Sequence, residues 1–512
     1  MKISYFILIF LLTTELCSSF IIQPFGLKIN RKKSYFKHHI CKHKPYNNFY
    51  MQHDKKDKGS NAIIFNNKKL KLFDIPVTPE VCAISIVYFI QGLFGICRLA
   101  LNFYYKDTLH LSPADLTIIS SISAIPWVIK PLYGFISDTF PLFGYKRRSY
   151  LLLSGLLSSF SWGIISYISM MINNGIILGD NITTSYIVFL VTLSSLGIAF
   201  GDVLIDAIVV GKSRDLKVAG SLQSICWSSS AIGGVISAYL SGYLLQNYGA
   251  TFVFSATAII PLAMTAAAVL IDEKKIDDCN DNSCILIDKT NNIEKVKIQI
   301  VSIWNTIQHK SILYPLLFLI IWNITPSAGS ALFYFEVNEL GFQPEFYGKL
   351  GLISSLSSFL GILIYNKNLK SIPLRTIFKW TCIIGTILGM SPLIMVTHLN
   401  RAIGIPDTLF AIIDDVVLSI LGQITFMPIM VLAAQMCPPG VEAMLYATIM
   451  SANNLSTSVS KLLGGGFTHL MGITNNNFQN LPWLLFITNI SGLIPLLFIH
   501  LVPDFKNDKK NE

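Results

Sequence analysis

Twelve apolar stretches, most of them about 20 residues long, fill the sequence from Cys82 to Leu501. A helix of about 20 residues crosses the roughly 30 Å of hydrocarbon in a bilayer. Charged residues make up 13% of the chain, against about 25% in soluble globular proteins. The sequence therefore predicts a helical membrane protein with many spans and disfavours the alternative, a large soluble helical protein.

The apolar stretches form two groups of six, separated by a polar loop. The predicted spans of the first group are Cys82–Tyr104, Ala114–Ser137, Ser149–Met171, Ser185–Val209, Ala219–Leu245 and Thr251–Ile271. Those of the second group are Ser311–Phe333, Tyr347–Tyr365, Thr376–Val396, Thr408–Ala434, Val441–Gly465 and Leu481–Leu501. Two sets of six spans around a long central loop are the layout of a two-half transporter. We therefore predict an all-α membrane protein with twelve transmembrane helices in two six-helix halves.

The domain boundaries follow from these groups. The two halves occupy residues 76–271 and 311–505, joined by a linker loop at 272–310 and followed by a short tail at 506–512. Basic residues are concentrated in the connections after even-numbered spans; Lys146, Arg147 and Arg148, for example, follow the second span. Because basic loops stay in the cytosol, we predict that the linker loop and the tail are cytosolic.

The first 75 residues allow two interpretations. Residues 1–20 contain an apolar run of signal-peptide length, and residues 21–75 are rich in Lys and Asn, with no acid between Lys28 and Asp54. This is either a two-part leader that sends the protein to a complex plastid, or a disordered basic tail in the cytosol. The destination is accordingly the plasma membrane or a complex-plastid membrane. Much of the formal net charge of +10 comes from this region and from short loops, so it does not indicate nucleic-acid binding.

Signatures of enzymes are absent from the sequence. It contains no P-loop, no HExxH and no GxSxG motif. Cys279 and Cys284 lie in a polar loop without histidines at zinc spacing. We predict no catalytic residue, no metal site and no cofactor.

Ionisable residues inside the apolar stretches are the candidate functional residues. Lys130 precedes a proline in WVIKPLYGFISD, although a charge in hydrocarbon costs roughly 2.5–3.5 kcal/mol. Asp202 and Asp206 are four residues apart, so both carboxyl groups lie on one face of the fourth span. Two like charges so close disfavour double ionisation. They predict a protonatable pair, or a pair neutralised by Lys130 and by Arg98 of the first span.

Each of these residues also has a structural interpretation. Arg98 and Lys130 have long side chains that reach toward the outer and the cytosolic interface, respectively. Asp202 and Asp206 have short side chains, so their structural role would be an ion pair within the helix bundle. Three further candidates lie in the tenth span, where a position near the outer surface is the alternative for the two acids. These candidates are Asp414, Asp415 and Gln423.

The connection after the second span carries a recognisable motif. GFISDTFPLFGYKRRSY resembles the loop motif of the major facilitator superfamily. The resemblance implies a gating latch in which Asp138, one helical turn after Gly134, pairs with Arg147 and Arg148. An insertion of TFPLF between Asp138 and Gly144 departs from the commonest form of the motif. The alternative, a basic cytosolic anchor, is compatible with a latch.

Three longer runs narrow the resemblance. WVIKPLYGFISDTFPLFGYKRRSYL, AGSLQSICWSSSAIGGVISAYLSG and DDVVLSILGQITFMPIMVLAAQMCPPGVEAMLYATIMSANN look like the folate–biopterin transporter family, a branch of the facilitator superfamily. The similarity covers Val87 to Leu501, and the leader, which has no counterpart in the family, suits an apicomplexan-type member. The resemblance implies transport of folates, pterins or related aromatic precursors, often together with protons. The alternative is a facilitator for another small organic anion or an amino acid; a receptor or a membrane-embedded enzyme fits the sequence less well.

These observations combine into a hypothesis for the site. A folate carboxylate binding at Lys130 would release Asp202 or Asp206 to take up a proton. Aromatic side chains of the first half would stack on the pterin ring, although each has a packing or lipid-facing role as its alternative. The aromatic candidates are Tyr88, Phe89, Trp127 and Trp227.

Overall fold

The computed structural model describes residues 64–65, 68–69, 71–72, 75–212, 216–273, 301, 304–369, 372–436 and 442–503. The predictions for the signal-like segment, for most of the leader and the linker loop, and for the C-terminal tail lie outside these residues. Two short antiparallel hairpins precede the first helix. In them β1 (Ile64–Phe65) pairs with β2 (Lys68–Lys69), and β3 (Lys71–Leu72) pairs with β4 (Ile75–Pro76).

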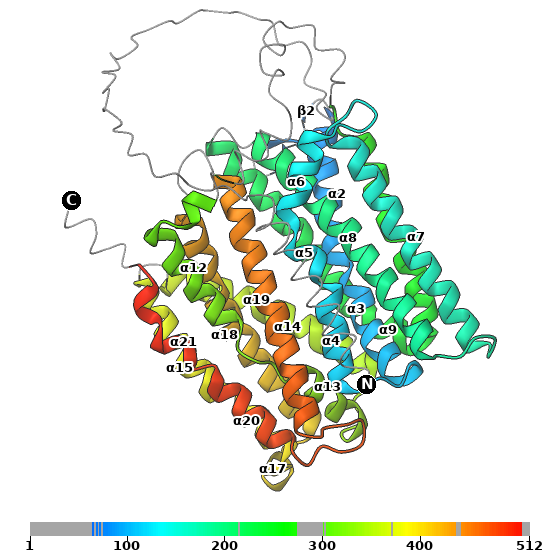
Figure 1. The fold of residues 1–512 in the computed structure, drawn as a ribbon, viewed down its shortest axis with the longest axis vertical. Coiled ribbons are helices and arrows are strands. Elements are labelled where there is room, and N and C mark those ends of the chain that lie inside the picture. Colours follow the sequence, from blue (N-terminus) through cyan, green and yellow to red (C-terminus); the bar gives the residue numbers. More distant parts are fainter. Residues whose placement is uncertain are drawn as a thin grey trace, which may run out of the picture. The chain divides into compact units, whose positions relative to one another are not determined.

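Most of the rest of the described chain is helical. The elements of the first half are α2 (Pro79–Leu93), α3 (Gly95–Phe103), η1 (Tyr104–Thr108), α4 (Pro113–Ser123), α5 (Ile125–Val128), α6 (Lys130–Thr139), α7 (Arg148–Asn173), α8 (Asn181–Lys212) and α9 (Leu216–Val269). Those of the second half are α12 (Lys310–Asn323), α13 (Gly329–Asn338), α14 (Pro344–Ile364), η3 (Tyr365–Leu369), α15 (Leu374–Leu388), α16 (Ser391–Val396), α17 (Leu399–Ala402), α18 (Asp407–Gln435), α19 (Glu442–Leu470), α20 (Leu481–Ser491), α21 (Ile494–Leu497) and η4 (Ile499–Leu501). Figure 1 shows these helices as a bundle in which most run along a common direction.

Local sequence explains where the helices begin and turn. Thr78 caps α2, and Ser112 forms a capping box with Asp115 at the start of α4. The long element α9 contains the predicted fifth and sixth spans. It changes direction at Gly249, whose φ of 79° favours glycine.

Two predicted spans are interrupted. The second span is divided into α4, α5 and α6, with non-helical backbone at Ile129 between the last two. The seventh is divided into α12 and α13 around the segment Ile324–Ala328, which contains Pro326. Proline lacks the N–H that a continuous helix requires and disfavours helical backbone at the residue before it. In transporters, such interruptions are typical of binding sites near the middle of the membrane.

Within the described residues, seven helices are long and apolar enough to cross a membrane. One of them, Ile225–Val269, contains both the fifth and the sixth predicted spans. Two shorter apolar helices, Lys310–Asn323 and Leu481–Leu497, belong to the seventh and the twelfth. Each predicted stretch is thus largely helical, while the count of twelve complete spans stays a prediction.

The buried apolar residues show how the two halves meet. One core cluster contains residues of both halves, and its members lie toward the ends predicted to face away from the cytosol. Phe103 packs edge-on against Phe333 at 5.3 Å there, and Tyr334 donates a hydrogen bond of 2.8 Å to the carbonyl of Leu111. At the opposite ends each half has its own separate core. The shared packing therefore closes the interface on the outer side.

Candidate functional site

Lys130 and Asp202 form an ion pair inside the first half. Lys130 is the first residue of α6, after the interruption at Ile129, and Asp202 lies in the middle of α8. The lysine Nζ contacts Asp202 Oδ2, and the side chains are only 15% and 9% exposed. A positive charge at a helix N-terminus opposes the helix dipole. The carboxylate of Asp202 offsets this cost.

Two residues of α2 complete the arrangement. Gln91 donates from Nε2 to Asp202 Oδ1 at 2.7 Å, and the Tyr88 hydroxyl donates to Asp206 Oδ1. Since Tyr88 and Gln91 are three residues apart, they lie on one face of α2, opposite the two acids on one face of α8. We call Tyr88, Gln91, Lys130, Asp202 and Asp206 the N-half cluster. It holds one amino group and two carboxyl groups.

Trp127 borders this cluster. Lys130 Nζ lies 4.5 Å from the centroid of the Trp127 ring, within the range of a cation–π interaction. The indole N–H donates to Ser195 Oγ at 3.1 Å, which fixes the ring against α8. The Trp127 carbonyl accepts a hydrogen bond of 3.1 Å from Asn454 of α19. The N-half cluster therefore lies beside the contact between the two halves.

The other aromatic candidates are placed differently. Trp227 is 57% exposed, and Phe89 is half-buried on α2, where its carbonyl lies close to Gly233 of α9. Of the four aromatic candidates, Tyr88 and Trp127 are the two that the structure brings to the N-half cluster.

Arg98 does not join the N-half cluster. Its side chain is exposed, and it forms no ion pair with an acid among the described residues. It lies instead within electrostatic reach of Lys461 on α19. Lys461 was not predicted from the sequence.

The acids of the tenth span lie beside a third acid. Asp414 accepts a hydrogen bond from Ser391 Oγ, and Glu336 accepts one of 2.6 Å from the Tyr347 hydroxyl. Glu336, at the end of α13, lies within electrostatic reach of Asp414 and Asp415. The structure thus places three carboxyl groups near one another in the second half.

Gln423 is separate from these acids. It packs with its Cβ close to Gly361 of α14, two turns further along α18 from Asp415. Among the described residues there is no group of three or more potential ligands placed to hold a metal ion.

The predicted latch is not formed in this structure. Asp138 is exposed and makes no hydrogen bond or ion pair with Arg147 or Arg148. The carboxylate of Glu273 instead accepts hydrogen bonds of 2.8–3.2 Å from the backbone N–H groups of residues 146–148. An acid at the start of a helix satisfies its free N–H groups and interacts favourably with its dipole. Glu273 therefore anchors the start of α7.

Gly134, the other member of the motif, lies on α6, where a side-chain carbon would come 3.8 Å from Val203 of α8. This distance is ordinary contact. The structure therefore shows no steric requirement for glycine at this position.

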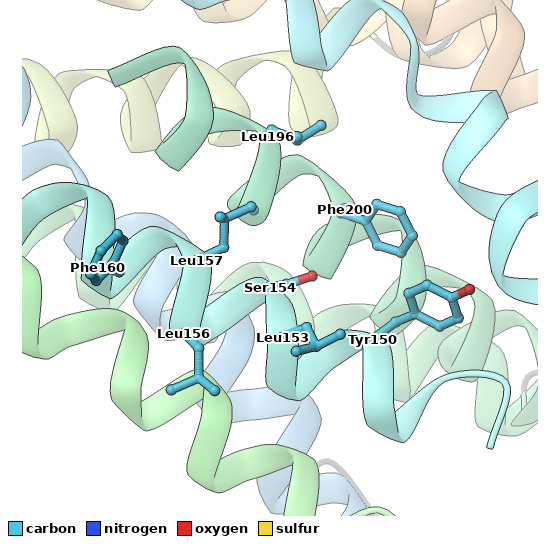
Figure 2. A pocket seen from close by; sticks show the side chains of 9 residues that line it. Tyr150, Leu153, Ser154, Leu156, Leu157, Phe160, Leu196 and Phe200 are labelled. Carbon is cyan, nitrogen blue, oxygen red and sulfur yellow. The ribbon is translucent and has the colours of Figure 1, made fainter. Parts of the chain in front are cut away.

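A hollow between α7 and α8 is unrelated to these charged residues. Figure 2 shows Leu153, Leu157 and Phe160 of α7 beside Leu196 and Phe200 of α8. Tyr150 and Ser154 supply the polar atoms of the lining. Such a surface suits lipid chains, and it is distinct from the N-half cluster.

Several residues that the structure places at these sites were not predicted from the sequence. Gln91 and Glu273 are polar residues whose partners are more than 100 positions away in the chain, so no local pattern reveals them. Lys461 and Glu336 carried a usable signal. Lys461 is the only Lys or Arg in α19, and Glu336 is the only acid in α13.

Two solved membrane transporters have a similar fold. The chain matches the nucleoside transporter NupG with a TM-score of 0.59 and 15% identity, covering 82% of this chain and 98% of that one. It matches a D-xylose-proton symporter with a TM-score of 0.57 and 13% identity, covering 83% and 98%. The chain is therefore a multi-pass membrane protein with the major facilitator fold, as the sequence predicted.

Relatives in sequence define the family. Residues 91–512 match the BT1 family, and the chain belongs to it. The chain is 42% identical over 442 residues to the folate-biopterin transporter of Synechocystis sp., covering 86% of this chain and 84% of that protein. It is 31% identical over 431 residues to folate transporter 1 of Plasmodium falciparum, covering 83% and 80%. The predicted family is confirmed, and the protein is a transporter, not an enzyme.

Proposed function

We propose that this protein is a secondary-active transporter of folates and related pterins or aromatic precursors, and that it couples their movement to protons. The names of its relatives in Synechocystis and Plasmodium support the substrate class. The observation that carries the proposal is the buried ion pair of Lys130 and Asp202 beside the contact between the two halves. Ionisable residues at membrane depth are expensive and mark substrate or proton pathways.

The ion pair supplies a means of coupling. A substrate carboxylate that approaches Lys130 competes with Asp202 for the ammonium group. Once Asp202 loses its cation, its remaining partner is the amide of Gln91. Asp202 and Asp206 then share one face of α8 with no cation between them, so the pair takes up a proton. Substrate and proton would then be held in the same cluster and released together.

Asp206 is a second place for the proton. It lies one turn from Asp202 on the same face of α8 and receives a hydrogen bond from Tyr88. Lys130 reaches Asp202, so one positive charge serves two carboxyl groups. A proton on Asp206 removes the unbalanced negative charge. We propose that Asp206 carries the transported proton and that Asp202 controls access to Lys130.

The packing of the halves supports alternating access. The shared core joins them on the outer side, while the opposite ends have separate cores. In the proposed cycle the outer contacts open and the opposite ends close. The latch between Asp138 and the arginines of the following loop would form in that second state.

Counterflow in proteoliposomes tests the substrate class without requiring an energy source. Vesicles are loaded with unlabelled compound and their uptake of labelled folate is followed, with empty vesicles as the control. Loading with folate or biopterin is expected to accelerate uptake, and loading with a neutral amino acid is not. Acceleration by amino acids alone would refute the proposed substrate class.

A further inference from the structure

Two unpaired cations, one from each half, lie on the outer side of the N-half cluster. Arg98 belongs to α3 and Lys461 to α19, and they are within electrostatic reach of each other. Neither forms an ion pair with an acid among the described residues. Two like charges repel and are costly in a membrane interior. Their proximity calls for an anion between them.

Helix geometry places Arg98 on the outer side of the N-half cluster. Gln91, which bonds Asp202, is seven residues before Arg98. The hydrogen bond from Phe94 N to Ile90 O keeps the helix nearly continuous between α2 and α3. Seven residues are about two turns, so both side chains lie on the same face, about 10 Å apart along the axis.

The same spacing recurs on α19. Asn454, which bonds the Trp127 carbonyl beside Lys130, is seven residues before Lys461. These two side chains therefore also share a face, again about 10 Å apart along the axis. The first and the eleventh spans are predicted to run in the same direction. On both helices, therefore, the seven residues lead from the N-half cluster toward the outer side. Arg98 on α3 and Lys461 on α19 therefore lie at the same depth in the membrane, about 10 Å from the N-half cluster toward the outer side.

The surroundings at this depth distinguish Arg98 from a residue that faces lipid. Phe94 and Leu101, four residues before and three residues after Arg98 on the same helix face, pack against the core that the two halves share. Ser460, adjacent to Lys461, donates a hydrogen bond of 2.5 Å to the carbonyl of Thr325 in the interruption of the seventh span. Arg98 and Lys461 therefore lie at the depth where the shared core begins. Beside them is non-helical backbone of the kind that lines transporter binding sites.

We propose that Arg98 and Lys461 together bind one carboxylate of a dianionic substrate between the two halves, while its second carboxylate approaches Lys130. This inference rests on the proposed function and adds a specificity site to it. Arginine binds a carboxylate through two parallel hydrogen bonds, and lysine adds a compact charge. A substrate without a carboxylate gains nothing from either residue. The pair would therefore select folates over uncharged pterins.

The test compares folate, which carries two glutamate carboxylates, with biopterin, which carries none. Wild-type protein, Arg98→Gln, Lys461→Gln and the double variant are reconstituted, and the uptake of both labelled compounds is measured. Each single variant is expected to lower folate uptake about 10-fold or more while biopterin uptake stays within about two-fold, because charge-assisted hydrogen bonds to carboxylates are strong and directional. Lys461→Arg is expected to restore part of the folate uptake.

Biopterin uptake reports that each variant is folded. Lys349→Gln removes an exposed lysine from the ion pair with Glu345 on α14 and is the matched control; it should change neither compound. Equal losses of folate and biopterin, or an unchanged folate-to-biopterin ratio in active variants, would overturn the inference and leave the proposed function intact. Wild-type vesicles that take up neither compound would overturn the proposed function itself.

Discussion

Removing the charge of Lys130 should destabilise the protein strongly. The Asp202 side chain is 9% exposed, and Lys130 is its cationic partner. Breaking a buried ion pair by removing one partner costs roughly 3–5 kcal/mol, because the other charge is left uncompensated. Lys130→Ala also removes the cation–π contact with Trp127, which contributes about 0.5–2 kcal/mol. We expect a large fall in the free energy of unfolding for this single variant.

Asp202→Asn should rescue most of this loss. In the double variant Lys130→Ala/Asp202→Asn the cluster has no unbalanced charge once Asp206 holds the proton proposed above, and an asparagine at position 202 keeps a hydrogen-bond acceptor for Gln91. The deficit that remains should be near the cation–π contribution, about 0.5–2 kcal/mol. Unfolding of the purified variants in detergent by heat or denaturant measures these differences.

An exposed ion pair gives the control. Lys349 and Glu345 are 61% and 49% exposed and lie four residues apart, so Lys349→Ala should leave the free energy of unfolding nearly unchanged. The single variant Asp202→Asn completes the comparison. If the losses in free energy of unfolding of Lys130→Ala and Asp202→Asn simply add in the double variant, Lys130 and Asp202 are not coupled. The proposed mechanism would then lose its basis.

Three further predictions concern other parts of the structure. In Asp206→Asn, an inwardly directed proton gradient should no longer accelerate folate uptake, while counterflow should continue. A response to the gradient equal to that of the wild type would exclude Asp206 as the proton carrier. Glu273→Ala should lower stability by about 1–2 kcal/mol, because the N–H groups at the start of α7 lose their acceptor; an unchanged melting temperature would contradict this anchoring role. Gly242→Ala should push α9 from α14 and open the outer side, because its Cβ would lie 2.4 Å from the Pro344 carbonyl oxygen. Spin-label distances across the outer ends report this opening, with Gly234→Ala, whose Cβ has open space, as the control that should leave the distances unchanged.

The sequence predicted most of the helical architecture because bilayer thickness restricts the length of an apolar span. Two details of the helices became clear only from the structure, although the residues that cause them are visible in the sequence. Pro326 explains the interruption of the seventh span, and the turn at Gly249 separates the fifth span from the sixth. Neither detail is visible in hydropathy alone, since both lie inside or beside apolar sequence.

The candidate site was less accessible to sequence reasoning. The spacing of Asp202 and Asp206 predicted a shared face, because one helix sets that relation. Which cation the acids would contact was left open, because that choice depends on how separate helices pack. The structure brings Lys130 to Asp202 and leaves Arg98 beside Lys461. Gln91, at 2.7 Å from Asp202, depends on the same packing and has no local signature.

Accumulation of labelled folate by wild-type protein in proteoliposomes, driven only by an imposed pH gradient, tests the central claim most directly. The proposed cycle releases substrate and proton together from the N-half cluster. It therefore predicts that folate rises above its equilibrium level when the outside is acidic, and that a protonophore abolishes this rise. Vesicles that never exceed equilibrium, or that accumulate folate equally with the protonophore present, would contradict it.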